Sequence, residues 1–173
     1  KYLEPVNKKF FVGIDVSASM DSKISSMNLT SREAAGVITY SLLKAEPSVK
    51  ICLFSSNFTY VNNVNKINSL DDIQNIIKQQ AFMATNCGLQ IEYAIKNKLD
   101  VDCFVTITDN EVNQGFKPSV LLKEYRKVMN KPDTKLIVLA TTANEFSIAD
   151  PKDPNMFDIA GFSADVPKVI SWI

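Results

Sequence analysis

Phe10-Phe11-Val12-Gly13-Ile14-Asp15-Val16-Ser17-Ala18-Ser19 is the stretch of sequence that decides the fold. Its first five residues form an apolar run rich in aromatic and β-branched side chains, which indicates a buried strand. Asp15, Ser17 and Ser19 place three oxygen-bearing side chains directly after that strand. Ligands of open α/β sheets bind at the carboxyl ends of the strands. The stretch therefore predicts both a buried strand and a binding site at its end.

Further stretches downstream have the composition of strands. Buried strands are expected over 49–54, 101–108 and 136–140, and a short last strand is expected over 156–161. Phe58-Thr59-Tyr60-Val61 follows the second strand after a short polar break, which predicts a hairpin and an antiparallel edge strand.

Apolar side chains at helical spacing predict helices between these strands. Thr30 or Ser31 is expected to cap the first helix, and Pro47 ends it. The other helices are expected to start near Ser69, near residue 88, at Pro118 and at Asp165. Trp172, in the last helix, is expected to lie in the core. The fourth helix is expected to turn inward Val120, Leu121, Tyr125, Val128 and Met129.

The alternation of strands and helices predicts the fold class. It indicates an α/β, Rossmann-like, doubly wound and mostly parallel sheet with one antiparallel edge strand. A length of 173 residues suits one domain over 1–173. The first residue is Lys1 and no signal peptide precedes the first apolar run, so the chain is expected to be a piece of a longer protein.

Composition excludes several functional classes. There is no histidine, which excludes Ser-His-Asp triads, Cys-His dyads and most zinc or iron sites. Lys and Arg together number 19, as do Asp and Glu, so the net charge gives no attraction to nucleic acid or to an anionic membrane. No apolar run approaches the roughly 20 residues that span a bilayer, and no membrane partner is expected.

The three cysteines show no metal-binding spacing. Cys52 and Cys103 lie in apolar, strand-like runs, so buried free thiols and a reducing compartment are expected. The sequons Asn28-Leu29-Thr30 and Asn57-Phe58-Thr59 favour an extracellular setting instead, and this alternative stays open at this stage.

Polar side chains follow more than one predicted strand. Asp15, Ser17 and Ser19 follow the first strand, the run from Thr108 to Glu111 follows the 101–108 strand, and Thr85 precedes a helix. All should gather at one edge of the sheet. Carboxylates and hydroxyls without nitrogen or sulfur donors suit a hard cation, with Mg²⁺ preferred and Mn²⁺ or Ca²⁺ as alternatives.

These residues resemble the metal-ion-dependent adhesion site of von Willebrand factor A-type (vWA) domains. The resemblance rests on Asp15-x-Ser17-x-Ser19, on Thr85 and on Ile107-Thr108-Asp109. It implies that Ser17 and Ser19 are direct metal ligands and that Thr85 and Asp109 bind directly or through water. Asp15 would mainly accept hydrogen bonds from waters and hydroxyls. Met83-Ala84-Thr85 departs from the family pattern, which often has a glycine before the threonine.

A wider resemblance covers nearly the whole chain. It rests on Asp15–Met20, Thr108–Glu111, Glu124–Lys127, Lys135–Val138 and Phe146–Pro151. Through these stretches the sequence looks like the carboxy-terminal domain of the Ro ribonucleoprotein autoantigen (TROVE) family, in which this domain closes a ring of helical repeats that carries most RNA contacts. The resemblance implies a parent protein that binds small non-coding RNA, and a cytoplasmic location with the nucleus as an additional one.

The leading hypothesis is therefore a binding domain, not an enzyme, whose metal is completed by an acidic residue of a protein partner. An extracellular adhesion or matrix domain is the first alternative. A Mg²⁺-dependent phosphohydrolase is disfavoured, because Ser17 stands where haloacid-dehalogenase-type enzymes carry a second aspartate, and because no GxxxxGK loop is present. Glu111 is expected to be a solvated surface residue. A solvated basic face is expected from Lys117, Lys123, Arg126, Lys127 and Lys131.

Overall fold

A computed structural model describes residues 4–24, 28–79, 84–109, 115, 117–141, 148–163 and 165–173. A six-stranded sheet forms the middle layer, in the order β3-β2-β1-β4-β5-β6. The strands are β1 (Lys9–Asp15), β2 (Ser48–Phe54), β3 (Phe58–Tyr60), β4 (Cys103–Thr108), β5 (Lys135–Ala140) and β6 (Met156–Ala160). The helices are α1 (Ser31–Ala45), α2 (Leu70–Lys78), α3 (Leu89–Lys96), α4 (Pro118–Met129) and α5 (Val166–Trp172), with two short 3-10 turns, η1 (Ala18–Asp21) and η2 (Val64–Lys66).

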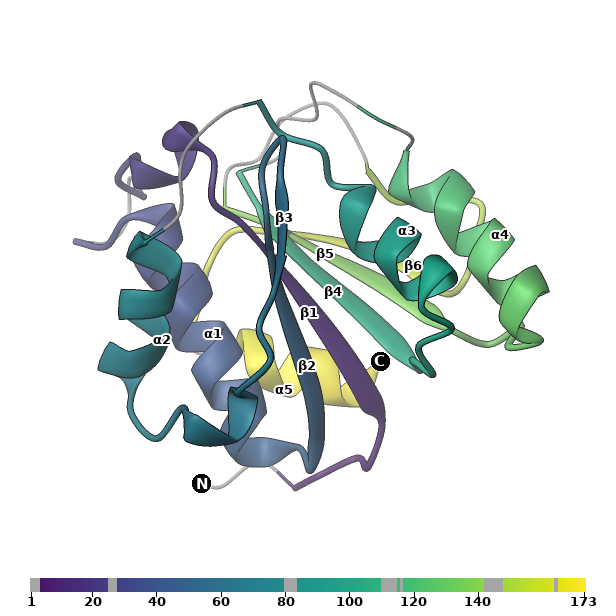
Figure 1. The fold of residues 1–173 in the computed structure, drawn as a ribbon, viewed down its shortest axis with the longest axis horizontal. Helices are drawn as coiled ribbons and strands as arrows, with labels where there is room; N and C mark the ends of the chain where they lie inside the picture. Colours follow the sequence, from purple (N-terminus) through teal and green to yellow (C-terminus); the bar gives the residue numbers. More distant parts are fainter. Residues whose placement is uncertain are drawn as a thin grey trace.

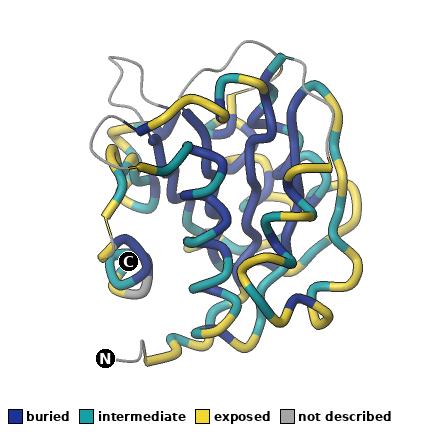
Figure 2. Tube along the Cα trace, turned by 90° about the vertical axis from the view of Figure 1, so that its left-hand side faces the viewer, coloured by how far each residue is buried: buried dark blue, intermediate teal, exposed yellow. Residues whose placement is uncertain are grey.

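The helices cover both faces of the sheet. Helices α1, α2 and α5 pack on one face, and α3 and α4 pack on the other (Figure 1). Only β3 runs antiparallel to its neighbour, and the other adjacent pairs are parallel. Buried residues concentrate in the strands and on the inner sides of the helices (Figure 2). The predicted doubly wound α/β fold with an antiparallel edge strand is confirmed.

Strand β1 lies in the interior of the sheet because its sequence can be buried on both faces. Phe10, Val12 and Ile14 pack toward α1 and α2, and Phe11 packs toward α3 and α4. Gly13 makes room for the buried amide of Gln90, since a Cβ at this position would lie 2.7 Å from the Gln90 side chain.

The side chain of Gln90 connects α3 to the sheet through hydrogen bonds. Its Nε2 donates to the carbonyl oxygens of Phe11, at 2.7 Å, and Val105, at 3.3 Å. Its Oε1 accepts from the Thr106 hydroxyl at 2.8 Å. The side chain is fully buried, so these hydrogen bonds satisfy a group that would otherwise be costly to bury. The start of α3 is thereby fixed against β1 and β4.

Two helix starts follow the sequence signals. Thr30 caps α1 in a capping box with Glu33, as the sequence predicts, and Pro47 follows the end of that helix. Ser69 caps α2 in a second capping box, with Asp72. Such boxes satisfy amide groups that have no partner within the helix.

Three predictions of buried side chains are wrong. Val120 and Val128 on α4 are 55% and 52% exposed, and Trp172 on α5 is 81% exposed. The buried side of α4 is formed by Leu121, Leu122 and Tyr125. Because each residue turns a helix by about 100°, Val120 and Val128 fall outside that face. Helix α5 packs through Val166 and Ile170, which leaves Trp172 on its outer side.

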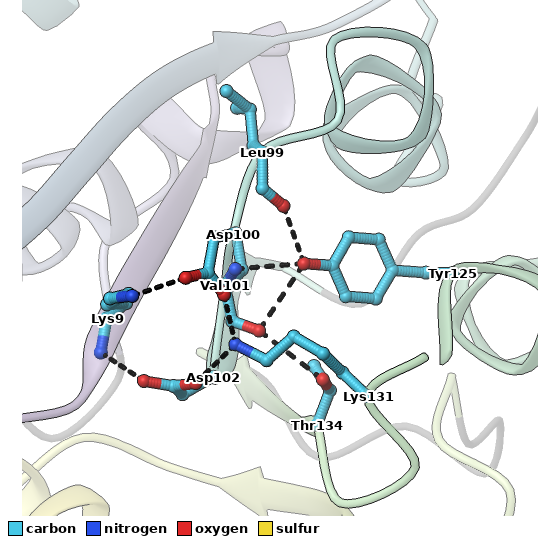
Figure 3. A network of polar contacts seen from close by, with 8 residues as sticks. All are labelled: Lys9, Leu99, Asp100, Val101, Asp102, Tyr125, Lys131 and Thr134. Atoms are coloured by element: carbon cyan, nitrogen blue, oxygen red, sulfur yellow. Dashed lines mark hydrogen bonds and ion pairs between the residues drawn. The ribbon is translucent and has the colours of Figure 1, made fainter. Parts of the chain in front are cut away.

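A polar network closes the amino edge of the sheet, at the end remote from the carboxyl termini of the parallel strands (Figure 3). Lys131 pairs with Asp100 and Asp102, and Lys9 also pairs with Asp100. The hydroxyl of Tyr125 accepts from the Val101 amide at 2.8 Å and donates to the Leu99 carbonyl at 2.6 Å. The network joins the starts of β1 and β4 to the loop before β5.

No helix in the described part of the chain combines the length and the apolar character that a membrane crossing requires.

Candidate metal centre

The carboxyl edge of the sheet brings most of the predicted site residues together. Asp15 is the last residue of β1, and Asp109 follows the last residue of β4, its direct neighbour in the sheet. Ser17 and Ser19 lie in the turn that follows β1. Chain segments far apart in sequence therefore converge on one point because parallel strands end at the same edge.

Asp15 is fully buried and held at both carboxylate oxygens. The amide of Ser17 donates to Oδ1 at 2.8 Å. The hydroxyl of Thr108, on β4, donates to Oδ2 at 2.7 Å. The carboxylate is thus fixed in orientation by β4 and by the loop that follows β1.

The two serines face each other across the turn. Their Oγ atoms lie 3.1 Å apart, and Ser17 is 4% exposed. Ser17 precedes η1, and its carbonyl oxygen accepts from the amide of Met20 at 3.1 Å. This tight turn brings the hydroxyls of Ser17 and Ser19 together beside Asp15.

Asp109 supplies a second buried carboxylate at this edge, with 7% of its surface exposed. Burial raises the pKa of Asp15 from 3.8 to about 6, and the hydrogen bonds that Asp15 accepts oppose this shift. The charge of Asp109 makes a smaller contribution to this rise in the pKa of Asp15, which places the two carboxylates in the same electrostatic neighbourhood. Two like charges in a buried site are unfavourable unless a cation or a proton accompanies them.

Thr85 lies in the segment that leads into α3 at this edge of the sheet. It is 1% exposed. The next residue, Asn86, donates its amide to the carbonyl of Ser55 at 3.0 Å, which anchors this segment at the end of β2. Since β2 is the other neighbour of β1, Thr85 approaches the site from the side opposite to Asp109.

Cys87 is a buried thiol whose pKa responds to the charges of Asp15 and Asp109. Burial raises its pKa well above the usual range, and the charges of Asp15 and Asp109 raise it further. Both effects favour the neutral thiol over the thiolate. All three cysteines are buried and free, as the sequence predicts.

The donor set suits a hard cation. It contains carboxylates and hydroxyls, and no cluster of three or more His, Cys, Asp or Glu occurs within the described ranges of the chain. A metal here would have to take hydroxyl and water oxygens alongside the carboxylates, which is the chemistry of Mg²⁺ and Mn²⁺ rather than of a thiolate-bound metal. Met83, Asn110 and Glu111 lie outside the described residues.

Arg32 is a site residue that the sequence reasoning missed. It is 3% exposed and donates to Asp21 and to the carbonyl oxygens of Ser17 and Ile77. The sequence does place the positive charge of Arg32 in the first turn of a predicted helix, which is an unusual position for a cation. The helix dipole disfavours a positive charge there, so a cation at this position calls for a specific partner.

The predicted basic face is largely neutralised. Lys123 pairs with Asp150 at 2.6 Å, Arg126 pairs with Asp153 at 2.5 Å, and Lys131 belongs to the amino-edge network. Of the five basic residues, only Lys117 and Lys127 have no ion pair within the described chain. Three of the five basic side chains are therefore neutralised by neighbouring aspartates.

Comparison with known sequences gives matches over nearly the whole chain. Residues 9–172 match the family model described as the Ro60 vWA domain. The chain is 36% identical to the RNA-binding protein RO60 of Caenorhabditis elegans over 169 residues, which cover 96% of this chain and 26% of that protein. It is 34% identical to the RNA-binding protein RO60 of Deinococcus radiodurans over 172 residues, which cover 98% of this chain and 32% of that protein. The chain thus spans about a quarter to a third of the curated relatives it matches.

Solved structures agree with these sequence matches. The crystal structure of the Deinococcus radiodurans RO (RSR) protein has a TM-score of 0.86 and 34% identity, covering 98% of this chain and 34% of that one. Proximal thread matrix protein 1 from the mussel byssus, solved with a zinc-occupied MIDAS motif, has a TM-score of 0.64 and 14% identity, covering 98% of this chain and 48% of that one. At that identity the second likeness is one of fold alone.

Proposed function

The chain belongs to the family of Ro60 vWA domains, and from this premise we propose that it is a metal-dependent ligand-recognition domain of an RNA-binding protein. The family that the sequence motifs indicated is thereby confirmed. The observation that carries the metal proposal is the buried pair of carboxylates, Asp15 and Asp109, beside the facing hydroxyls of Ser17 and Ser19.

The proposed ion is Mg²⁺, with Mn²⁺ and Ca²⁺ as alternatives. Ser17, Ser19, Thr85 and Asp109 would hold it, and Asp15 would order the surrounding waters and hydroxyls. Zinc occupies the MIDAS motif of the mussel byssus protein, so Zn²⁺ belongs among the metals tested on this chain. When bound, the metal supplies a Lewis-acidic position that an outside oxygen ligand can occupy.

The proposed partner at the metal is a protein that contributes an acidic side chain. Because Asp15 would act through waters and hydroxyls, Asp109 would be the one carboxylate that holds the divalent ion, and the ion would keep a positive charge that attracts another carboxylate. We assign RNA to the parts of a longer parent that lie outside this chain, because the relatives named RNA-binding proteins are three to four times as long. A cytoplasmic location, with the nucleus as an additional one, is part of the same proposal.

A binding role is also proposed in place of catalysis. Ser17 stands where an aspartyl-phosphate enzyme would need a carboxylate for proton transfer, and its backbone is committed to the turn around Asp15. We further propose that residues 1–173 form one domain. The names of the relatives favour this Ro-type function over an extracellular adhesion domain.

Calorimetric titration of the metal-free chain with Mg²⁺, Mn²⁺ and Zn²⁺ tests the metal proposal. The wild type should bind one ion, and a Ser17→Ala/Ser19→Ala double variant should lose binding while unfolding at nearly the wild-type temperature. Ser41→Ala is the matched control, because the Ser41 hydroxyl donates to a helix carbonyl of α1 away from the site. Equal binding by all three proteins, or no binding by the wild type, would refute the proposal.

A second titration tests the acidic partner with acetate as a minimal carboxylate probe. Mn²⁺-loaded wild type should broaden the NMR signal of acetate, because the paramagnetic ion relaxes a bound carboxylate. After unbound Mn²⁺ has been removed by dialysis, the double serine variant should leave the signal sharp at the same protein concentration. Absence of broadening by a protein that demonstrably holds Mn²⁺ would remove the acidic-partner part of the proposal and leave metal binding intact.

A further inference from the structure

Arg32 is a buried cation directly behind the turn that carries the two serines. Its side chain is 4% exposed, whereas that of its ionic partner Asp21 is 58% exposed. Nε donates to Asp21 Oδ1 at 2.6 Å, and one terminal nitrogen donates to Asp21 Oδ2 at 3.3 Å. A buried guanidinium is costly unless its donors are well used, so the stability of this enclosed position depends on the hydrogen bonds that Arg32 makes.

The same side chain also hydrogen-bonds to the backbone of Ser17. A terminal nitrogen of Arg32 donates to the Ser17 carbonyl oxygen at 3.3 Å. That carbonyl also accepts from the Met20 amide, while the Ser17 amide donates to Asp15. Ser17 is therefore fixed at both ends of its backbone, by a carboxylate on one side and by a guanidinium on the other. With its backbone held in this way, Ser17 places its hydroxyl next to that of Ser19.

Arg32 also reaches a second segment of the site. Its other terminal nitrogen donates to the Ile77 carbonyl oxygen at 3.4 Å, in the last turn of α2. Helix α2 ends at Lys78, seven residues before Thr85 in the sequence. One planar side chain thus connects the serine turn with the helix that leads toward the threonine.

We propose that Arg32 is a positioning residue that holds the serine turn in its metal-binding shape and couples this turn to the end of α2. The inference rests on the proposed metal function and deepens it. Arginine is required because its rigid fork presents donors to a carboxylate and to two carbonyls at once. Lysine would retain the charge without that geometry.

The test compares Arg32→Met and Arg32→Lys with the wild-type chain. Arg126→Met is the matched control: Arg126 has a side chain that is 13% exposed, pairs with Asp153 and donates to the Thr134 carbonyl. Both arginines are enclosed and ion-paired, but only Arg32 touches the serine turn. Mn²⁺ affinity should fall roughly 10- to 100-fold in Arg32→Met, the range for residues that orient metal ligands, and should be unchanged in Arg126→Met.

Amide hydrogen exchange of the metal-free proteins gives a readout that does not depend on a metal. The amides of Ser17 and Met20 should exchange faster in Arg32→Lys than in the wild type, because the turn loses the bond to the Ser17 carbonyl. The same amides should be unaffected in Arg126→Met. Asp21→Asn should show a smaller loss of Mn²⁺ affinity and a smaller increase in the exchange of the Ser17 and Met20 amides. Because Asp21 is half exposed, this variant keeps the test available if Arg32→Met does not fold.

Metal binding by the chain and the positioning role of Arg32 are tested by different outcomes. Wild-type Mn²⁺ affinity in Arg32→Lys and Asp21→Asn would overturn the positioning role, as would an equal loss in Arg126→Met. If the wild type binds no metal, the metal function fails, and the exchange of Ser17 and Met20 decides the role of Arg32 alone. Unchanged exchange in Arg32→Lys would then overturn it.

Discussion

Asp15 carries opposing electrostatic effects at a single residue. Burial favours its protonated form, while hydrogen bonds from Ser17 and Thr108 favour the carboxylate, and burial dominates. In the metal-free protein the folded state therefore holds this proton more tightly than the unfolded chain. The stability that the proton contributes is fully present below pH 3.8 and is lost as the pH rises through about 6.

Asp15→Asn should remove the loss of stability that ionisation of Asp15 causes as the pH rises, because the asparagine amide carries no charge. The free energy of unfolding of the metal-free variant at neutral pH should exceed that of the wild type by roughly 2 to 3 kcal/mol, because a pKa unit corresponds to about 1.4 kcal/mol. Urea unfolding at acidic and neutral pH checks the difference. A variant with the wild-type pH profile would show that Asp15 is not the group responsible.

The residues of the site differ in how far the sequence could predict them. Asp15, Ser17 and Ser19 are close in sequence, so their spacing alone indicated a shared site. Arg32 and Gln90 act through contacts with distant backbone, such as the bond from Gln90 to the Phe11 carbonyl 79 residues away. No local sequence pattern encodes such a contact. The sequence does show that Arg32 lies at a helix start, where a positive charge is unfavourable, but it does not show the groups that Arg32 contacts.

At the scale of the elements, strands were easier to predict than helix faces. The strands 101–108 and 136–140 appeared as continuous apolar runs because both of their faces are covered, and β4 and β5 occupy most of these ranges. Helix α4 has apolar residues on more than one side, so periodicity included the exposed Val120 and Val128 with the buried Leu121. Packing against α3 and the sheet, which the sequence does not specify, decided between them.

Gly13→Ala should loosen the junction between β1 and α3. The added methyl group would lie 2.7 Å from Gln90, whose amide is held by three hydrogen bonds and cannot move freely. We expect a loss of about 1 to 3 kcal/mol in the free energy of unfolding, as for overpacked cores. A double-mutant cycle with Gln90→Ala in denaturant measures the coupling. Strictly additive effects of the two substitutions would contradict direct contact between them.

At the scale of the whole molecule, the two edges of the sheet have different roles. The carboxyl edge gathers the candidate ligands, whereas the amino edge is cross-linked by Lys131, Asp100 and Asp102 (Figure 3). Hydrogen bonds from Lys131 and Lys9 lower the pKa of Asp100 to about 2. This contribution to stability is present above pH 3.8 and is lost as the pH falls through about 2.

Lys131→Met should therefore move the acid-unfolding midpoint to higher pH. The shift should be small, because Asp100 is half exposed and solvent screens the pair, and it should shrink further in high salt. Circular dichroism during acid titration measures the midpoint. Lys127→Met is the control on the same face of the chain, and an equal shift in both variants would argue against a specific role of the network.

The charge distribution predicts how the isolated chain behaves toward RNA. Its net charge is zero, and Lys123, Arg126 and Lys131 are paired with aspartates. We expect binding of labelled single-stranded RNA no tighter than the nonspecific range of about 10⁻⁴ to 10⁻⁶ M. Fluorescence anisotropy at physiological salt measures this. Nanomolar binding by this chain alone would show that RNA contacts lie within it.

The strand order also has a consequence for synthesis on the ribosome. Strand β1 is made first, but one of its two neighbours is β4, so that Phe10 pairs with Cys103. Until β4 leaves the exit tunnel, an emerging chain presents an apolar strand edge that can pair with the wrong partner. Nascent chains arrested before residue 103 should therefore be protease-sensitive, and those extending well beyond residue 140 should be resistant. This topology delays protection of the loop from Asp15 to Ser19, although its residues are translated early.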